Sequence, residues 1–106
     1  MTVTVTATAA LRQVDSGQFA VVGELGFDTV GGLLASSGAQ FAAAGTQFEV
    51  DLSGVTQSDS AGLALLIEWL KVATLNGKTV RFTRVPDQLR ALAQISEIDG
   101  FLPLSA

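Results

Sequence analysis

Apolar and polar residues alternate in two short segments near the start of the chain. Residues 9–14 and 18–25 carry apolar side chains at about every second position, which is typical of half-buried β-strands. The residues at 15–17, Asp-Ser-Gly, favour a tight turn, so the two segments predict an antiparallel hairpin. Thr alternates with Val or Ala before the hairpin, and residues 1–8 are therefore predicted to be an edge strand or a flexible tail.

Helical spacing follows the hairpin. Asp28 is a residue type that caps helices, and apolar residues recur after it at roughly every third or fourth position as far as Phe41. The Gly and Ser residues within this stretch weaken its helix propensity, so its ends are expected to be ragged. Residues 48–52 alternate again and predict a short strand, and the polar residues 53–59 predict a loop.

The second half of the chain continues the same alternation of elements. Residues 60–75 predict a long helix, which the Asn-Gly pair at 76–77 ends. Residues 79–83 are rich in β-formers and predict a strand. Pro86 suits the first turn of a last helix that runs through Ile95. The apolar tail at 101–104 is expected to dock on the body of the protein.

The predicted order of elements is strand, strand, helix, strand, helix, strand, helix, which defines an α/β fold. Helices between successive strands imply right-handed crossovers and parallel pairing, whereas the opening hairpin is antiparallel. The chain has 106 residues, which is enough for one domain, and we place that domain at residues 9–106. The sequence therefore predicts a small mixed sheet with helices packed against it.

The composition excludes several classes of site. The chain has no His and no Cys, which excludes histidine-dependent triads, thiol nucleophiles, disulfides and zinc clusters built on these residues. The net charge of −4 argues against nucleic acid as a partner. No apolar run is long enough to cross a bilayer, and the first ten residues lack the basic region of a signal peptide. We therefore expect a cytoplasmic protein without direct membrane insertion.

The charge is low and unevenly spread. Charged residues make up 15% of the chain, against about a quarter in an average domain. Residues 1–70 hold seven acids and one base, a net charge of −6, and residues 71–106 hold three acids and five bases, a net charge of +2. A surface this poor in charge is consistent with a partner that covers part of it.

The segment from Val50 to Leu63 concentrates the polar chemistry of the chain, because a strand there leads through a hydroxyl-rich loop into a helix. Backbone N–H groups at a helix start lack partners, and the helix dipole favours anions at that end. Asp59 or Ser60 can cap this helix, and a phosphate on Ser60 would be well placed by the same amides. Such a phosphate would add about −1.5 to −2 charges. The alternative is a simple helix cap preceded by a polar loop.

This segment holds no catalytic constellation. A nucleophile elbow requires Gly-x-Ser-x-Gly, but Ser58 stands where its first Gly should be, and no His is present to act as the base. A P-loop requires a Lys, which the loop lacks. Asp51 and Asp59 lie on opposite sides of the predicted loop and do not define an acid pair. We therefore expect no enzymatic activity, no cofactor and no metal site.

The helix at 60–75 carries apolar residues on two sides. One stripe, suited to the core, consists of Leu63, Leu66, Ile67, Leu70 and Thr74. The second consists of Ala61, Leu65, Trp69 and Val72, bordered by Glu68. This second stripe packs either against a neighbouring helix or against a partner. Because Trp is enriched in binding hot spots, the interface is favoured, with Trp69 or Leu65 as the anchor.

The residues around the helix start resemble a known family. Two runs of residues together resemble the signature of STAS domains, which occur in sulphate transporters and anti-sigma factor antagonists. These runs are Asp51-Leu52-Ser53-Gly54-Val55 and Asp59-Ser60-Ala61-Gly62-Leu63. Val22-Gly23-Glu24-Leu25 is similar to the end of that family's second strand, and the resemblance extends from about residue 10 to the end of the chain. It implies a mixed sheet of four or five strands with helices mainly on one face, and a protein-interaction domain without catalysis.

Within that family, the residues at 63–70, 86–89 and 101–104 look closer to the MlaB-type subunit of the bacterial phospholipid ABC transporter that maintains outer-membrane lipid asymmetry. This branch implies a partner, the cytoplasmic ATPase subunit, through which the protein would lie at the inner membrane. The alternative branch is the anti-sigma factor antagonists, which bind an anti-sigma factor kinase and are switched by phosphorylation, here at Ser60. Antagonists commonly have Asp-Ser-Ser-Gly, and Ala61 departs from that pattern.

The predicted partner-binding surface is the start of the helix together with its second stripe. Its members are Ser58, Asp59, Ser60, Ala61, Gly62, Leu65, Glu68, Trp69 and Val72. A homo-oligomer is left open by the sequence.

Overall fold

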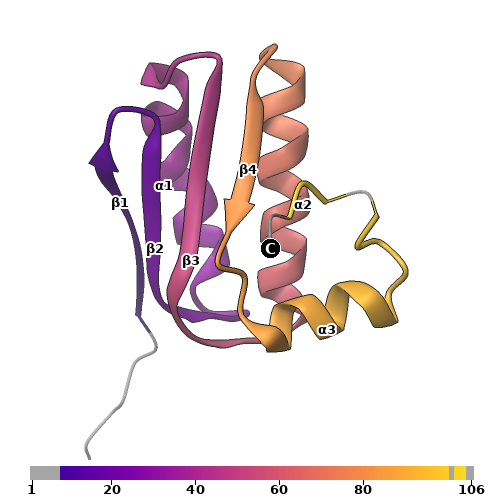
Figure 1. Ribbon diagram of the computed structural model, residues 1–106. Helices are drawn as coiled ribbons and strands as arrows, with labels where there is room; N and C mark the ends of the chain where they lie inside the picture. Colours follow the sequence, from indigo (N-terminus) through magenta and orange to yellow (C-terminus); the bar gives the residue numbers. More distant parts are fainter. Residues whose placement is uncertain (1–7, 101, 105–106) are drawn as a thin grey trace, which may run out of the picture.

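A mixed β-sheet forms the centre of the structure, a computed structural model that describes residues 8–100 and 102–104. Within these residues the sheet has four strands in the order β1-β2-β3-β4. The first pair is antiparallel and the other two pairs are parallel (Figure 1). The elements are β1 (Ala9–Asp15), β2 (Gln18–Leu25), α1 (Val30–Ala43), β3 (Gln47–Ser58), α2 (Ser60–Leu75), β4 (Thr79–Thr83) and α3 (Asp87–Ile95). The α/β class, the element order and the mixed sheet are confirmed.

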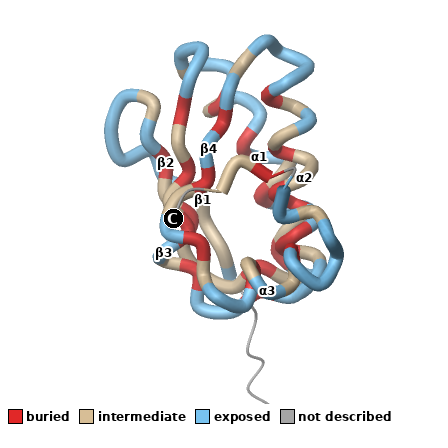
Figure 2. Tube along the Cα trace, turned by 45° about the vertical axis from the view of Figure 1, so that its right-hand side comes forward, coloured by how far each residue is buried: buried red, intermediate tan, exposed pale blue. Residues whose placement is uncertain are grey.

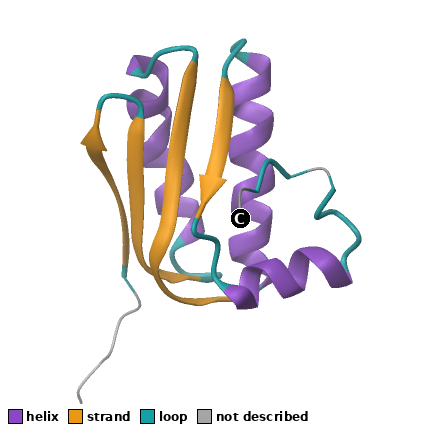
Figure 3. Cartoon of the chain, viewed as in Figure 1, coloured by secondary structure: helices purple, strands orange, loops and turns teal. Residues whose placement is uncertain are grey.

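The helices lie mainly on one side of the sheet, as predicted. Helices α1 and α2 run side by side over the same face, and α3 lies near the start of α2 (Figures 1 and 3). Because β2, β3 and β4 are parallel, their carboxyl ends lie at one edge of the sheet. All three helices begin at that edge, which therefore gathers the loops that follow the strands (Figure 3). No helix in the described part of the chain is both long and apolar enough to cross a membrane.

The core consists of buried residues of the strands and of the helices that cover them (Figure 2, red). Alternate strand residues point into it, because successive side chains of a strand face opposite sides of the sheet. Phe19, Phe41 and Phe48 contact one another there, with ring centroids 4.6–5.8 Å apart. On β3 and β4 the residues that alternate with the buried ones include Glu49, Asp51 and Arg81. An ion pair joins Asp51 Oδ2 to Arg84 Nη1 at 3.5 Å.

The predicted loop at 53–59 is wrong, because β3 continues through Ser58. Its hydroxyl and glycine residues suggested a loop, but they pair with β2 as far as Leu25 opposite Ser58. The register of this pairing shifts twice, and Gly54 lies close to β2 where the first shift occurs. A Cβ at Gly54 would meet Val21 O at 2.9 Å, so only glycine permits this approach.

The predicted cap of the first helix is also wrong by one residue. Thr29, not Asp28, is the N-cap of α1, and its side chain makes no capping bond within the helix. The helix at 60–75 has the predicted limits, and α3 begins one residue after Pro86.

Near the C-terminus the chain contacts the body of the domain. Leu102 is buried and Leu104 forms a parallel bridge with Phe82, so the described part of the predicted tail contacts the body. Of the predicted edge strand or tail at residues 1–8, residues 1–7 lie outside the described part, and so does Phe101.

Candidate partner-binding site at the start of helix α2

A single residue, Asp59, joins β3 to α2 and fixes the start of the helix. Its Oδ1 accepts a hydrogen bond from the Ala61 N–H at 2.8 Å, and its backbone oxygen accepts from the Gly62 N–H at 3.0 Å. Its own N–H donates to Leu25 O at 3.1 Å, which ties the helix start to the end of β2. Of the two predicted caps, the structure therefore has Asp59, which satisfies N–H groups that would otherwise lack partners.

Gly62 lets the first turn of α2 approach the sheet closely. A Cβ at this position would lie 2.1 Å from Ser58 Oγ, 3.0 Å from Leu25 Cβ and 3.3 Å from Leu25 O. Real Cβ atoms essentially never come within 3.0 Å of a heavy atom outside their own residue and its two chain neighbours. The glycine of the motif is thus explained by packing, since a larger residue would push α2 away from β2 and β3.

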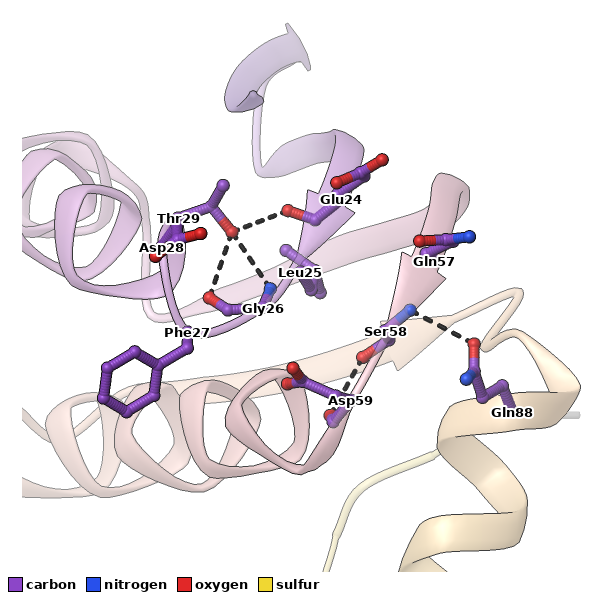
Figure 4. Close-up of a pocket in the computed structure, with 10 residues that line it drawn as sticks. All are labelled: Glu24, Leu25, Gly26, Phe27, Asp28, Thr29, Gln57, Ser58, Asp59 and Gln88. Atoms are coloured by element: carbon purple, nitrogen blue, oxygen red, sulfur yellow. Dashed lines mark hydrogen bonds between the residues drawn. The ribbon is translucent and has the colours of Figure 1, made fainter. Parts of the chain in front are cut away.

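A cleft of about 430 Å³ opens beside this helix start, between the β2–α1 loop and the end of β3 (Figure 4). Thr29 holds the loop side, because its hydroxyl donates to Glu24 O at 2.6 Å and accepts from the Gly26 N–H at 3.0 Å. Gln88 of α3 holds the other side, because its Oε1 accepts from the Ser58 N–H at 3.2 Å. Hydrogen bonds of Thr29 and Gln88, which are far apart in the sequence, therefore hold the two sides of the cleft in place.

The cleft is acidic. Glu24, Asp28 and Asp59 line it, and no Lys or Arg is among the described residues that do so. The ion pairs found in the described part of the chain, Lys71 with Glu68 and Arg84 with Asp51, involve none of these three carboxylates.

Ser60 is the first residue of α2 and is exposed. Because Asp59 caps the helix, no structural hydrogen bond of the described chain engages the Ser60 hydroxyl. This side chain is accessible to a partner or to a modifying enzyme, and a change of its charge would occur next to Asp59, which lines the acidic cleft.

The partner interface favoured for Leu65 and Trp69 does not fit their burial, and the structure has the alternative, packing against a neighbouring helix. Leu65 is 3% exposed and Trp69 is 0% exposed. The indole N–H of Trp69 donates to Ser37 Oγ of α1 at 2.9 Å, and its ring packs edge-on against Phe41. The physical reason is that α2 packs against two elements, the sheet and α1. The side of α2 that carries Leu65 and Trp69 is therefore buried. Neither residue offers a surface to a partner in this structure.

The accessible face of α2 therefore differs from the predicted one. Its exposed residues are Ser60, Ala64, Lys71, Thr74 and Leu75, and Glu68 is partly exposed between Ala64 and Lys71. Thr74 was predicted to belong to the core stripe, and its exposure corrects that prediction. Of the predicted surface, Asp59 and Ser60 are exposed, Ala61, Glu68 and Val72 are half-buried, and Ser58, Gly62, Leu65 and Trp69 are buried.

The sequence reasoning missed Phe27, which lines the cleft and is 89% exposed. The sequence did contain a sign of it. Phe27 is an apolar residue in the connection Gly26-Phe27-Asp28, where it belongs neither to the alternating pattern of the strand nor to the helical spacing that follows.

Comparison with known proteins identifies the family. The sequence model of the family described as "Mlab, STAS domain" matches residues 9–104. The chain belongs to the MlaB-type STAS domain family. STAS domains are generally non-enzymatic domains that interact with partner proteins.

Two solved structures have the same fold. One is the anti-sigma factor antagonist SpoIIAA in its unphosphorylated form, with a TM-score of 0.69, 17% identity, and coverage of 92% of this chain and 88% of that one. The other is an anti-sigma factor antagonist from Mycobacterium paratuberculosis, with a TM-score of 0.69, 21% identity, and coverage of 93% and 85%. No curated protein matches the sequence significantly. The four-stranded mixed sheet with its helices is thus the STAS fold.

Proposed function

We propose that this protein is the STAS subunit that binds and regulates the cytoplasmic ATPase of a phospholipid ABC transporter maintaining outer-membrane lipid asymmetry. The observation that carries the proposal is the match of residues 9–104 to the MlaB-type family. The protein would act at the cytoplasmic side of the inner membrane, through its partner and without catalysis of its own.

The site geometry supports a docking role at the start of α2. The side chains of Asp59 and Gln88 accept hydrogen bonds from backbone N–H groups, and Gly62 permits close packing, so this helix start is held in place before a partner arrives. Ser60 stands exposed on it. A preformed surface loses less conformational entropy on binding than a mobile one.

The second candidate function is that of an anti-sigma factor antagonist switched by phosphorylation. The specific observation in its favour is the exposed Ser60 hydroxyl at the first position of α2, on a fold shared with two such antagonists. Both are under 25% identical to this chain, and Ala61 departs from the antagonist pattern, so the transporter function is preferred.

The test is a titration of the transporter ATPase subunit from the same organism with the purified protein, followed by calorimetry and by the ATP hydrolysis rate. We expect wild-type protein to bind and to change that rate. Ser60→Asp should weaken binding more than Ser60→Ala, because the new charge falls in the interface. The fold should tolerate it, since a negative charge at a helix N-terminus is favourable by about 0.3–1 kcal/mol.

The matched control is Ser16→Asp, which adds the same charge to the exposed turn between β1 and β2, at the opposite end of the sheet. It should bind like wild type. Absence of any binding by the wild-type protein would refute the transporter function. Transfer of phosphate from ATP to Ser60 by an anti-sigma factor kinase, detected by intact mass, would favour the second candidate instead.

A further inference from the structure

Among the residues that the structure describes, Phe27 is the largest apolar side chain placed almost wholly in solvent. It is 89% exposed, whereas Phe19, Phe41, Phe48 and Phe82 are each at most 3% exposed. A phenylalanine side chain contributes about 150–250 Å² of apolar surface when it is buried. Phe27 is exposed on the rim of the acidic cleft, so burying it against another molecule would contribute a large favourable free energy to binding.

The loop that carries Phe27 is held by hydrogen bonds on both sides of it. The N–H groups of Thr29 and Val30 donate to Gly26 O at 3.0 and 3.1 Å, and the buried Thr29 hydroxyl bridges Gly26 and Glu24. The backbone on either side of Phe27 is thus fixed (Figure 4). An aromatic side chain with few rotatable bonds on a fixed backbone loses little entropy when it is bound, which is typical of an interface anchor.

From these observations we propose that Phe27 is the anchor through which this protein docks on its partner, and that the partner surface is an apolar socket surrounded by Arg or Lys side chains. The inference rests on the proposed function and names the chemistry of its interface. The charge requirement follows from Glu24, Asp28 and Asp59, which line the cleft beside Phe27 and form no ion pair with another described residue. A cationic socket would complement these three carboxylates.

The same charges disfavour two other occupants. A bilayer surface with anionic lipids would attract basic residues, but it would repel the carboxylates around Phe27. A symmetric dimer that buried Phe27 against a second copy would bring the same acidic patch onto itself, because a two-fold interface uses the same surface on both subunits. A cationic protein surface is the occupant that satisfies both the aromatic side chain and the charge.

The first arm of the test compares alanine variants of exposed apolar residues in binding to the purified ATPase subunit. Phe27→Ala should weaken binding at least about thirty-fold, which corresponds to about 2 kcal/mol at 1.4 kcal/mol per factor of ten. Leu75→Ala and Ile95→Ala are matched controls, since these side chains are 84% and 79% exposed at other places. They should bind like wild type, and all three variants should keep the wild-type unfolding midpoint in urea.

The second arm tests the charge of the socket. Neutralising the cleft with Glu24→Gln and Asp28→Asn should slow association and flatten its dependence on salt, because opposite charges steer the encounter. Asp59 is not changed, since it caps α2. Tighter binding by the neutralised variant would overturn the proposed cationic socket.

The outcomes separate the inference from the proposed function. Wild-type binding that Phe27→Ala leaves unchanged would overturn the Phe27 anchor while the proposed function stands. No wild-type binding would refute both. Phe27-dependent sedimentation with vesicles of phosphatidylethanolamine and phosphatidylglycerol, or Phe27-dependent dimerisation in analytical ultracentrifugation, would overturn the inference in favour of a membrane or a second copy.

Discussion

Replacing Gly62 with alanine tests whether the motif glycine serves packing. A Cβ at this position would overlap Ser58 Oγ at 2.1 Å and lie 3.0 Å from Leu25 Cβ. The Ser58 side chain is buried, at 4% exposure, so it has little room to move away. The Leu25 atoms belong to a strand that pairs on both sides and cannot yield without disturbing the sheet. We therefore expect α2 to shift outward in Gly62→Ala.

The magnitude follows from two opposed effects. Glycine to alanine within a helix stabilises by about 0.4–1 kcal/mol when the added methyl group meets open space. Forcing a methyl group into a packed site costs typically about 1–3 kcal/mol. Gly32 is the matched control, because it is also the third residue of its helix and a Cβ there would meet nothing within 4 Å. Gly32→Ala should thus raise the free energy of unfolding, and Gly62→Ala should lower it by about 1–2 kcal/mol net.

Urea unfolding followed by Trp69 fluorescence measures both variants, because this buried indole reports on the packing of α2 against α1. A third protein, Ser58→Ala with Gly62→Ala, removes the Ser58 Oγ overlap and leaves the Leu25 contact. The cost of the Gly62 change should be smaller in that background, which a double-mutant cycle reads directly. If Gly62→Ala and Gly32→Ala stabilise the protein equally, the packing explanation of the motif is refuted.

Two further predictions concern contacts between α1 and its neighbours. Trp69→Phe removes the hydrogen bond to Ser37 and leaves a smaller ring, so it should lower the free energy of unfolding by about 1–3 kcal/mol while the folded protein keeps its partner affinity in calorimetry. Lys78 Nζ donates to three carbonyls at the end of α1, and Lys78→Met should cost about 1–2 kcal/mol in urea unfolding. The control Lys71→Met, which breaks the exposed pair with Glu68, should cost less than about 1 kcal/mol.

The sequence predicted the elements that short-range chemistry determines. Helix α2 has the predicted limits because Asp59 caps one end and the Asn-Gly pair ends the other. The hairpin of β1 and β2 forms around Gly17, whose φ of +68° suits the glycine of the predicted turn. In both cases the residues that decide the structure are neighbours in the chain, so the pattern of residue types was sufficient.

The sequence predictions were wrong where an element distant in the chain determines the local structure. Residues 53–58 have the composition of a loop, yet β2 pairs with them and makes them a strand. Trp69 has the position of a surface residue on a helix that packs only against the sheet, yet α2 also packs against α1, where Ser37 Oγ accepts a hydrogen bond from the indole N–H. No local pattern indicates that Ser37, 32 positions earlier, lies opposite Trp69.

The residues of the signature and those next to it differ in whether they make structural contacts. Asp51 accepts the Ser53 N–H at 2.8 Å and pairs with Arg84, Asp59 caps α2, and Gly62 permits close packing, so these signature residues maintain the fold. Ser60, which belongs to the signature, and Phe27, which does not, make no such structural contact and are exposed. The buried and capping residues of the signature therefore identify the domain, whereas we expect the choice of partner to depend on exposed residues such as these two.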